Sequence, residues 1–280
     1  MNPVLRPARP DDRDEVVELL HTRMNAKIPR ERWGLLFDYP WRPDDAPDCG
    51  RVLEDKGHVV GFLGATYVDR LIEGVLFRIC NMSSWYLLRD YRGRGYGRAM
   101  ARDLTADPNL TYTDLTATPQ VHAMLLGHAG FSILDDERWL LRRCESLKRF
   151  IAVRDSGTEA PHVRDHRGFR DLRIIEVAAE DGACTVVLQV KKKQQDIAYH
   201  QLLHVDQPSV LAQHAEAIAT AILPEQPAVL AIDQRLLPIA PAGGEVERIA
   251  QPRLFKSRRL RRDQIDNLYN EVLLLDQKLP

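Results

Sequence analysis

The chain has 280 residues, of which 44% are hydrophobic and 28% are charged, and this is enough apolar content for one large core or two ordinary ones. Its 39 basic and 40 acidic residues give a formal net charge of −1, which excludes a global field that would attract nucleic acid or an anionic membrane surface. We therefore expect two compact domains, and any basic site must be local.

The cysteines and the N-terminal stretch indicate the cellular compartment of the protein. The cysteine spacing contains no C-x-x-C motif, so it predicts reduced structural thiols, with neither a bound metal nor a disulfide framework, at Cys49, Cys80, Cys144 and Cys184. The opening MNPVLRPARPDDRDEVVELL has prolines and acids where a signal peptide needs an apolar run, and no segment approaches the roughly 20 apolar residues of a membrane span. The expected protein is cytoplasmic and has no membrane contact.

The first elements in chain order are a short strand and a helix. The strand begins near Val4, and Asp11 or Asp12 caps a helix whose apolar residues recur at helical spacing. An aromatic-rich segment interrupted by prolines follows, which predicts the end of a helix and an irregular loop. Its aromatic side chains either wall a pocket or pack as core beneath the loop, and they are Trp33, Phe37, Tyr39 and Trp41.

An antiparallel meander is predicted next. Its turns are Lys56-Gly57 and Glu73-Gly74. Its β-rich runs are residues 52–54 with 59–68, 75–79 and 82–88.

A glycine-rich turn, a helix ended by Pro108, and a strand and helix in residues 110–130 come after the meander. Residues 131–144 then predict a hairpin, with Asp135 and Asp136 in its turn.

A change of composition near residue 150 predicts a domain boundary. The polar, Gly- and Pro-containing stretch 151–167 is typical of an interdomain linker, so we assign 1–150 to a first domain and 168–280 to a second α/β domain. In the second part we expect two strands around a lysine-rich turn, a helix capped by Ser209, a further strand, and a last helix starting near Asp263.

The stretch RDYRGRGYGRAM, residues 89–100, carries the clearest chemistry. A strand that feeds a glycine-rich turn at the start of a helix can hold phosphate, because small residues leave backbone N–H groups accessible and the helix N-terminus adds partial positive charge. No G-x-x-x-x-G-K-[ST] motif is present, and the turn follows an antiparallel meander instead of opening a βαβ unit. The P-loop and dinucleotide-binding interpretations are therefore set aside.

In this context the turn resembles the signature [RQ]-x-x-G-x-[GA] of the GNAT superfamily of acyl-CoA-dependent N-acyltransferases, with Arg92, Gly95 and Gly97 in the motif positions. The order of elements from Val4 to about Cys144 is also similar. The resemblance implies a GNAT-type α/β fold, with a mixed, mostly antiparallel sheet flanked by helices. It also implies acetyl-CoA as acyl donor, with its pyrophosphate on backbone amides of the turn and its pantetheine along the preceding strand. The implied cofactor-binding residues are Leu87, Leu88, Arg92, Gly93, Arg94, Gly95, Tyr96, Gly97 and Arg98.

The catalytic residues are less defined. Many family members place a tyrosine that protonates the leaving thiolate where this chain has Leu126, which cannot donate a proton. Candidate donors are His128, His122 and Tyr112; otherwise bulk water serves, or the domain binds acyl-CoA without turnover.

Candidates for the base are Glu73 in a turn and the polar positions Asn81, Ser83 and Ser84, which lie where the acceptor amine would arrive, although alternating polar residues on a half-exposed strand need no function. We interpret Cys80 as a core residue, because the sequence shows no base to activate it.

These features predict an N-acetyltransferase that acts on the amine of a small molecule, such as an amino sugar, by direct attack. Two alternatives stay open: a non-catalytic acyl-CoA-binding regulatory module, and a nucleic-acid-associated protein that uses the cations of Arg253–Arg262, which we interpret as a solvated face. The second domain would be a degenerate GNAT-like domain that covers the acceptor site or packs in a homodimer.

Overall fold

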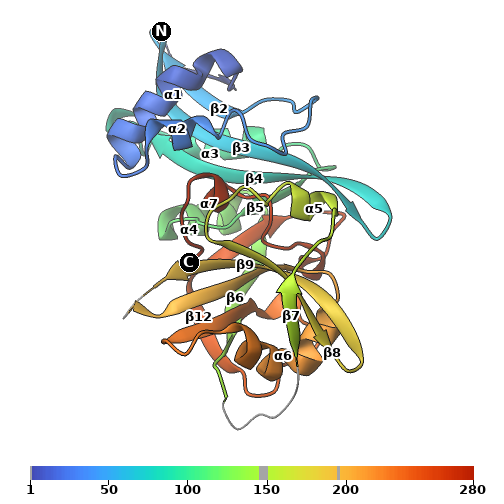
Figure 1. Cartoon of the computed structure of the whole chain (residues 1–280). Coiled ribbons are helices and arrows are strands. Elements are labelled where there is room, and N and C mark those ends of the chain that lie inside the picture. Colours follow the sequence, from blue (N-terminus) through green and yellow to red (C-terminus); the bar gives the residue numbers. More distant parts are fainter. Residues whose placement is uncertain (1, 145–150, 194–195) are drawn as a thin grey trace. The chain divides into compact units, whose positions relative to one another are not determined.

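The computed structural model describes residues 2–144, 151–193 and 196–280, and these form two compact units (Figure 1). Unit 1 comprises Met1–Leu134, Gln251–Arg261 and Tyr269–Pro280, and unit 2 comprises Asp135–Ala250 and Arg262–Leu268. The predicted boundary at residue 150 lies outside the described residues. The stretch expected to be a linker, 151–167, contains strand β7 (Ala152–Asp155) and helix α5 (Pro161–Arg164).

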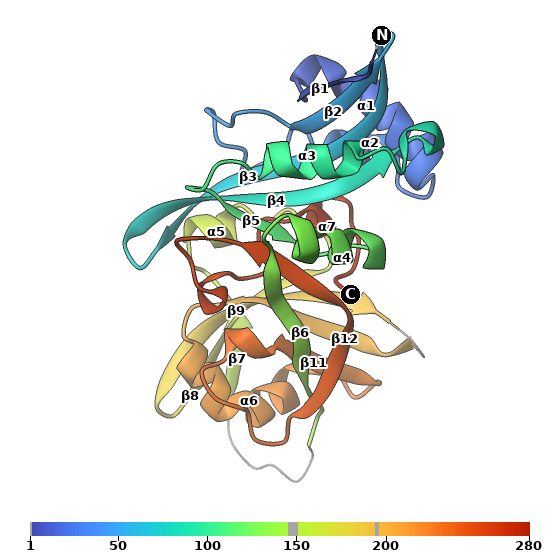
Figure 2. The same cartoon turned by 180° about the vertical axis from the view of Figure 1, so that it is seen from behind.

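Unit 1 contains a sheet in the order β1-β2-β3-β4-β5-β12. The pairs are antiparallel except for the parallel pair β4–β5, so the predicted fold class, a mixed and mostly antiparallel α/β sheet, is confirmed. The strands are β1 (Val4–Pro7), β2 (Gly50–Asp55), β3 (His58–Ile72), β4 (Val75–Leu87), β5 (Thr111–Asp114) and β12 (Glu245–Lys256), and the helices are α1 (Arg13–Leu19), α2 (Arg30–Gly34), α3 (Tyr96–Leu104), α4 (Pro119–His128) and α7 (Glu271–Leu274). Helices α1 and α2 cover one face, and α3 and α4 cover the other (Figures 1 and 2).

Both predicted hairpin turns are confirmed. Lys56 (φ 53°) with Gly57 (φ 81°), and Glu73 (φ 51°) with Gly74 (φ 78°), adopt the two consecutive positive φ angles of a tight hairpin turn. The runs 75–79 and 82–88, predicted as separate strands, are instead the single strand β4. Residues 79–83 pair regularly with β3, and a bulge lies further along β4, where the register shifts between Phe62 and Gly64.

The core of unit 1 is built between the sheet and helices α3 and α4. Met100, Ala101 and Leu104 of α3 pack with Leu125 of α4, as the helical spacing predicts. On the opposite face, the aromatic residues of the loop are buried and pack as core: Phe37 stacks on Phe62 at 5.8 Å between ring centroids, and its buried companions are Trp33, Tyr39 and Trp41.

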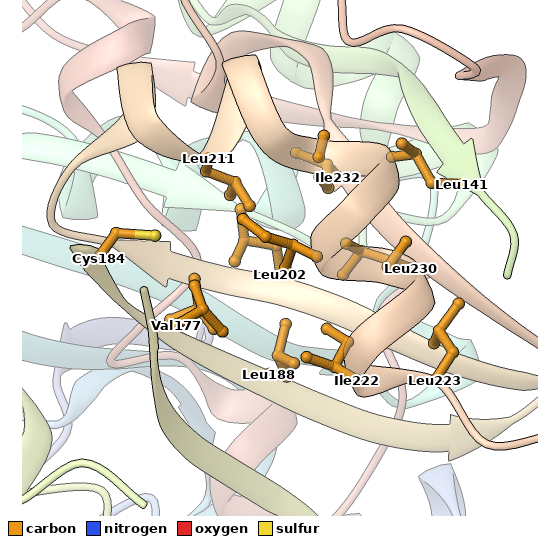
Figure 3. Close-up of a cluster of buried hydrophobic side chains, with 14 of the residues drawn as sticks. Leu141, Val177, Cys184, Leu188, Leu202, Leu211, Ile222, Leu223, Leu230 and Ile232 are labelled. Atoms are coloured by element: carbon orange, nitrogen blue, oxygen red, sulfur yellow. The ribbon is translucent and has the colours of Figure 1, made fainter. Parts of the chain in front are cut away.

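Unit 2 contains a sheet in the order β12-β6-β11-β10-β9-β8-β7. Its further elements are β6 (Ser132–Leu141), β8 (Leu172–Ala179), β9 (Gly182–Lys192), β10 (Ala198–Val205), α6 (Pro208–Ile222) and β11 (Ala228–Asp233). Helix α6 packs Leu211 and Ile222 against strand residues such as Leu202 and Leu230 (Figure 3). The helix begins at Pro208, so the expected cap Ser209 lies inside it. Gln194 and Gln195 of the lysine-rich turn lie outside the described residues.

The element order of unit 2 repeats that of unit 1. An antiparallel meander, β8-β9-β10, leads through α6 to β11, which pairs in parallel with β10. The same order connects β2-β3-β4 through α3 to β5.

Two local predictions are wrong. Residues 131–144 do not form a hairpin, because Ser132–Leu141 is one strand, β6. Asp135, expected in a turn, is buried and pairs with the buried side chain of Arg235.

The expected long helix from Asp263 is also absent among the described residues: a 3-10 turn (Arg262–Gln264) and the short α7 take its place. The Asn267 side chain accepts from Arg235 (2.6 Å), and Tyr269 has a φ of 58°, which interrupts a helix.

Candidate active site

Unit 1 contains a pocket of about 450 Å³ at the end of β4. Its walls come from the end of β4, the glycine turn, the first residues of α3 and the first turn of α4. The lining residues are Trp85, Tyr86, Leu87, Arg92, Gly93, Gly95, Gly97, Arg98, Thr118, Gln120, Val121 and Met124.

The pocket lies where strand β4 separates from strand β5. The two strands pair only at Ile79–Asn81 with Thr111–Thr113. β4 then continues to Leu87, while β5 ends at Asp114 and the chain leads into α4. Beyond Asn81 the pocket-lining part of β4 therefore has no pairing with β5, which leaves backbone groups that an extended ligand could pair with in the manner of an added strand.

The glycine turn presents the start of α3 to the pocket. Gly93 (φ 73°) and Gly95 (φ 86°) adopt left-handed conformations that favour glycine, and Gly95 is the N-cap of α3. The first backbone N–H groups of a helix have no partner within the helix and carry partial positive charge. A phosphate group fits this helix end.

Gly97 tests whether the residues present fit such a ligand. A Cβ atom at Gly97 would lie 3.5 Å from Leu87 Cδ1 and 3.6 Å from Trp85 Cζ2, which are ordinary contact distances. Its φ is not in the left-handed region, so neither conformation nor packing requires glycine there. The missing side chain leaves the helix backbone open toward two pocket-lining residues, as the close approach of a pyrophosphate demands.

The arginines of the turn differ in their surroundings. Arg92 donates from Nε to the Leu87 carbonyl (2.7 Å), and its guanidinium lies 5.0 Å from the centroid of the Tyr86 ring, so it braces the end of β4. Arg98 lines the pocket. Of the nine residues predicted for the cofactor, three do not line the pocket: Leu88, Arg94 and Tyr96.

None of the predicted proton donors lines the pocket. Tyr112 is buried, its hydroxyl donates to the Asp107 carbonyl (3.1 Å), and burial raises its pKa. His128 is exposed at the end of α4, and Leu126 packs on the hydrophobic core. The structure therefore brings neither His128 nor Tyr112 to the pocket.

The polar positions of β4 lie closer to the pocket. Ser84 is 8% exposed, directly precedes the pocket residue Trp85, and has a φ of 51°, an uncommon conformation for serine. Ser83 is 4% exposed. Cys80 is fully buried, which raises the pKa of its thiol, as expected of a core residue.

A buried carboxyl pair was not found by sequence reasoning. Asp114 ends β5 and Glu271 begins α7, and burial raises the pKa of each to about 7. Asp114 at the end of a strand is a weak signal, and nothing in the sequence places Glu271 beside it.

The basic cluster does not form one solvated face. Arg253 is buried, and Lys256 donates from Nζ to the Thr105 carbonyl at 2.9 Å. The Arg259 guanidinium lies 4.7 Å from the centroid of the Phe77 ring. These contacts stabilise the fold and leave fewer cations to contact a nucleic-acid backbone.

A comparison with known sequences identifies a family for part of the chain. Residues 14–107 match the sequence model of the acetyltransferase (GNAT) family. The chain carries a GNAT acetyltransferase domain. The glycine turn, the start of α3 and the unpaired end of β4 are the features of this domain that would fit acetyl-CoA as donor. The curated proteins returned no match.

Solved structures are similar in fold to nearly the whole chain, and not only to residues 14–107. A probable N-acyltransferase from Enterococcus faecalis V583 is similar with a TM-score of 0.57 at 11% identity, over 92% of this chain and 73% of that one. A GCN5-related N-acetyltransferase from Kribbella flavida has a TM-score of 0.56 at 13% identity, over 91% and 72%. A putative acetyltransferase from Pyrococcus horikoshii has a TM-score of 0.50 at 15% identity, over 99% and 96%. At these identities the likeness concerns the fold alone.

The described residues contain neither a membrane-spanning helix nor a cluster of metal ligands. No helix in them has the length and apolar character needed to cross a membrane. In residues 2–144, 151–193 and 196–280, no three His, Cys, Asp or Glu side chains are placed to hold a metal ion.

Proposed function

We propose that the chain is an N-acetyltransferase that moves the acetyl group of acetyl-CoA to the amine of a small molecule. The observation that carries the proposal is the pocket itself, where a glycine turn at a helix start meets the unpaired end of a β-strand. When bound, acetyl-CoA supplies an activated thioester.

Different residues of the chain would bind different parts of the donor. Backbone amides of residues 92–98 would hold the pyrophosphate, with Arg98 adding charge at the pocket wall. The main chain of Leu87 would pair with the pantetheine arm, whereas the Leu88 backbone N–H already donates to the Val60 carbonyl (2.9 Å). Arg92 keeps the end of β4 in place through its bond to the Leu87 carbonyl.

Two features of unit 1 favour a small amine acceptor. The aromatic loop on the side of α1 and α2 is packed as core and contributes no residue to the pocket wall. Beside the pocket, β4 carries the uncharged polar residues Ser83 and Ser84, and among the described residues no acidic side chain lines the pocket wall. We propose a single primary amine of a small molecule, with an amino sugar as one example, as the group that is acetylated.

For unit 2 we propose a degenerate GNAT-like domain without a donor site. Its element order repeats that of unit 1, but the turn between β10 and α6 has Asp206 and Gln207 where unit 1 has glycines. Asp206 accepts from the Thr185 backbone N–H (2.7 Å), and a carboxylate at this turn would repel a phosphate. Its role would be to cover the acceptor or to form a homodimer contact.

A second candidate is an acyl-CoA-binding module without turnover, which Leu126 in place of the usual family tyrosine favours. Thiol release from acetyl-CoA in the presence of a panel of small amines separates the two. We expect amine-dependent release of free thiol. If acetyl-CoA binds, but no amine in a broad panel releases thiol above the rate of hydrolysis, the chain is a binding module.

A further inference from the structure

Two carboxyl groups are buried together where β4 and β5 separate. Asp114 and Glu271 are 5% and 2% exposed. The Glu271 backbone N–H donates to Asn81 Oδ1 (3.0 Å), which fixes the start of α7 against β4. The Thr116 hydroxyl donates to Glu271 Oε1 (2.8 Å), and the Thr116 backbone N–H donates to Asp114 Oδ1 (3.2 Å). Thr116 therefore bonds both carboxyl groups and holds them beside each other.

The surroundings of the pair offer no neutralising cation. Neither carboxyl group forms an ion pair with a cation in the described part of the chain. On α2, Arg32 donates to the Leu274 carbonyl, and on β3 the Arg70 guanidinium lies over the Tyr269 ring. Burial, and then the negative charge of Asp114, raises the pKa of Glu271 to about 7. Two like charges in one buried site are costly, which favours protonation of one of the two carboxyl groups near neutral pH.

One oxygen of the carboxyl pair and the hydroxyl oxygen of a β4 serine are buried without a hydrogen-bond partner among the described residues. These atoms are Glu271 Oε2 and Ser83 Oγ. The register of β4 with β3 is regular from Thr66–Asn81 to Gly64–Ser83, so the side chains of Asn81 and Ser83 lie on one face of β4. Beyond Ser83 the register with β3 shifts, so Ser83 immediately precedes the bulge that leads to Trp85 and Tyr86, which line the pocket. Because buried polar atoms are nearly always satisfied, each of these two oxygens is a candidate partner for a bound polar ligand.

We propose that Glu271, paired with Asp114, receives the proton released by the acceptor amine, with the Ser83 hydroxyl between the carboxyl group and the pocket. This inference rests on the proposed acetyl transfer. An N–H bond of the acceptor ammonium breaks, the Ser83 hydroxyl passes a proton on, and an O–H bond forms on Glu271. The neutral amine then forms the amide bond as the C–S bond breaks, and its second proton leaves on the thiol. The proton on Glu271 returns to solvent, so the reaction releases one proton and uses no other reactant.

The pH profile of amine-dependent thiol release tests the proposed roles of Glu271, Asp114 and Ser83. E271Q should lower kcat/KM at pH 7 by about 100-fold or more, the range of a lost general base, while acetyl-CoA binding by calorimetry stays unchanged. D114N removes the neighbouring charge, so it should keep activity and shift the acidic limb of the profile to lower pH. S83A should lower kcat without moving the limb. The matched control is E31Q in the exposed first turn of α2, which should leave the profile as in the unmodified chain.

A second readout does not depend on turnover. In carboxyl-carbon NMR of the full chain, the pair should titrate near neutral pH, and D114N should move the remaining titration to lower pH. An active chain whose E271Q variant keeps its rate and profile overturns this inference alone, as does a pair that titrates near pH 4. A chain that binds acetyl-CoA but releases no thiol with any amine overturns the proposed function and this inference together.

Discussion

The sharpest test of the donor site is the substitution Gly97→Ala. The new methyl group would make ordinary contacts with Leu87 (3.5 Å) and Trp85 (3.6 Å), so no clash opposes it. Alanine is also a better helix former than glycine, by about 0.5–1 kcal/mol. We therefore expect a folded chain with unchanged or slightly raised stability. The methyl group would nevertheless occupy the space through which a phosphate reaches the helix backbone.

The expected loss of binding follows from one charge-assisted hydrogen bond. Such a bond contributes about 1.5–3 kcal/mol, which corresponds to acetyl-CoA affinity weaker by roughly 10- to 150-fold. Calorimetric titration with acetyl-CoA measures this, and a thermal melt measures the stability in the same samples.

Gly127→Ala is a matched control. Gly127 lies in the last turn of α4, has open space around its Cβ position, has no left-handed φ and does not line the pocket. It should give a similar gain in helix propensity and unchanged acetyl-CoA binding. If Gly97→Ala binds acetyl-CoA as tightly as the control does, the phosphate does not approach the backbone at Gly97, and the reasoning is refuted.

Further outcomes concern stability and partners. Arg235→Ala should destabilise unit 2 by about 3–5 kcal/mol in a denaturant titration, because it leaves two buried aspartates without their cation; a loss below about 1 kcal/mol would contradict this. Since the pKa values of Asp114 and Glu271 are raised to about 7, their contribution to stability is present at low pH and is lost as the pH rises through 7. The urea midpoint should therefore fall between pH 5 and pH 8 by more in the unmodified chain than in E271Q, and equal falls would show that Glu271 does not titrate there. A gel-shift titration should show no salt-dependent complex with nucleic acid, and a complex that disappears on neutralising Arg258 and Arg259 would favour the nucleic-acid alternative.

Features that depend on a few neighbouring residues could be predicted from the sequence. The pairs Lys56-Gly57 and Glu73-Gly74 form the expected turns, because positive φ angles are a local property. The start of α3 after Gly95 and its apolar face follow from turn chemistry and helical spacing within one short stretch. The pocket that we propose for the donor also depends on a local stretch, since residues 85–98 supply most of its wall.

Local signals failed where a distant partner reversed them. Asp135 has the chemistry of a turn residue, but a buried ion pair with Arg235 holds it inside strand β6. The apolar stretch after Asp263 has helical spacing, but the contacts of Asn267 and the left-handed conformation of Tyr269 reduce it to a 3-10 turn and α7. Local propensities of a few tenths of a kcal/mol per residue are smaller than the cost of leaving a buried charge unpaired.

The sequence alone thus contained the family motif, and it predicted the donor and the backbone groups that would hold it. Only the tertiary structure placed Glu271, which bonds Thr116 across 155 residues of chain, beside Asp114. Likewise, only the tertiary structure shows that Leu254–Lys256 of β12 pairs with β5, which lies about 140 residues earlier in the sequence. A helix or a turn is specified by neighbours along the chain, whereas a proton-accepting site depends on burial and on charges that only folding brings together.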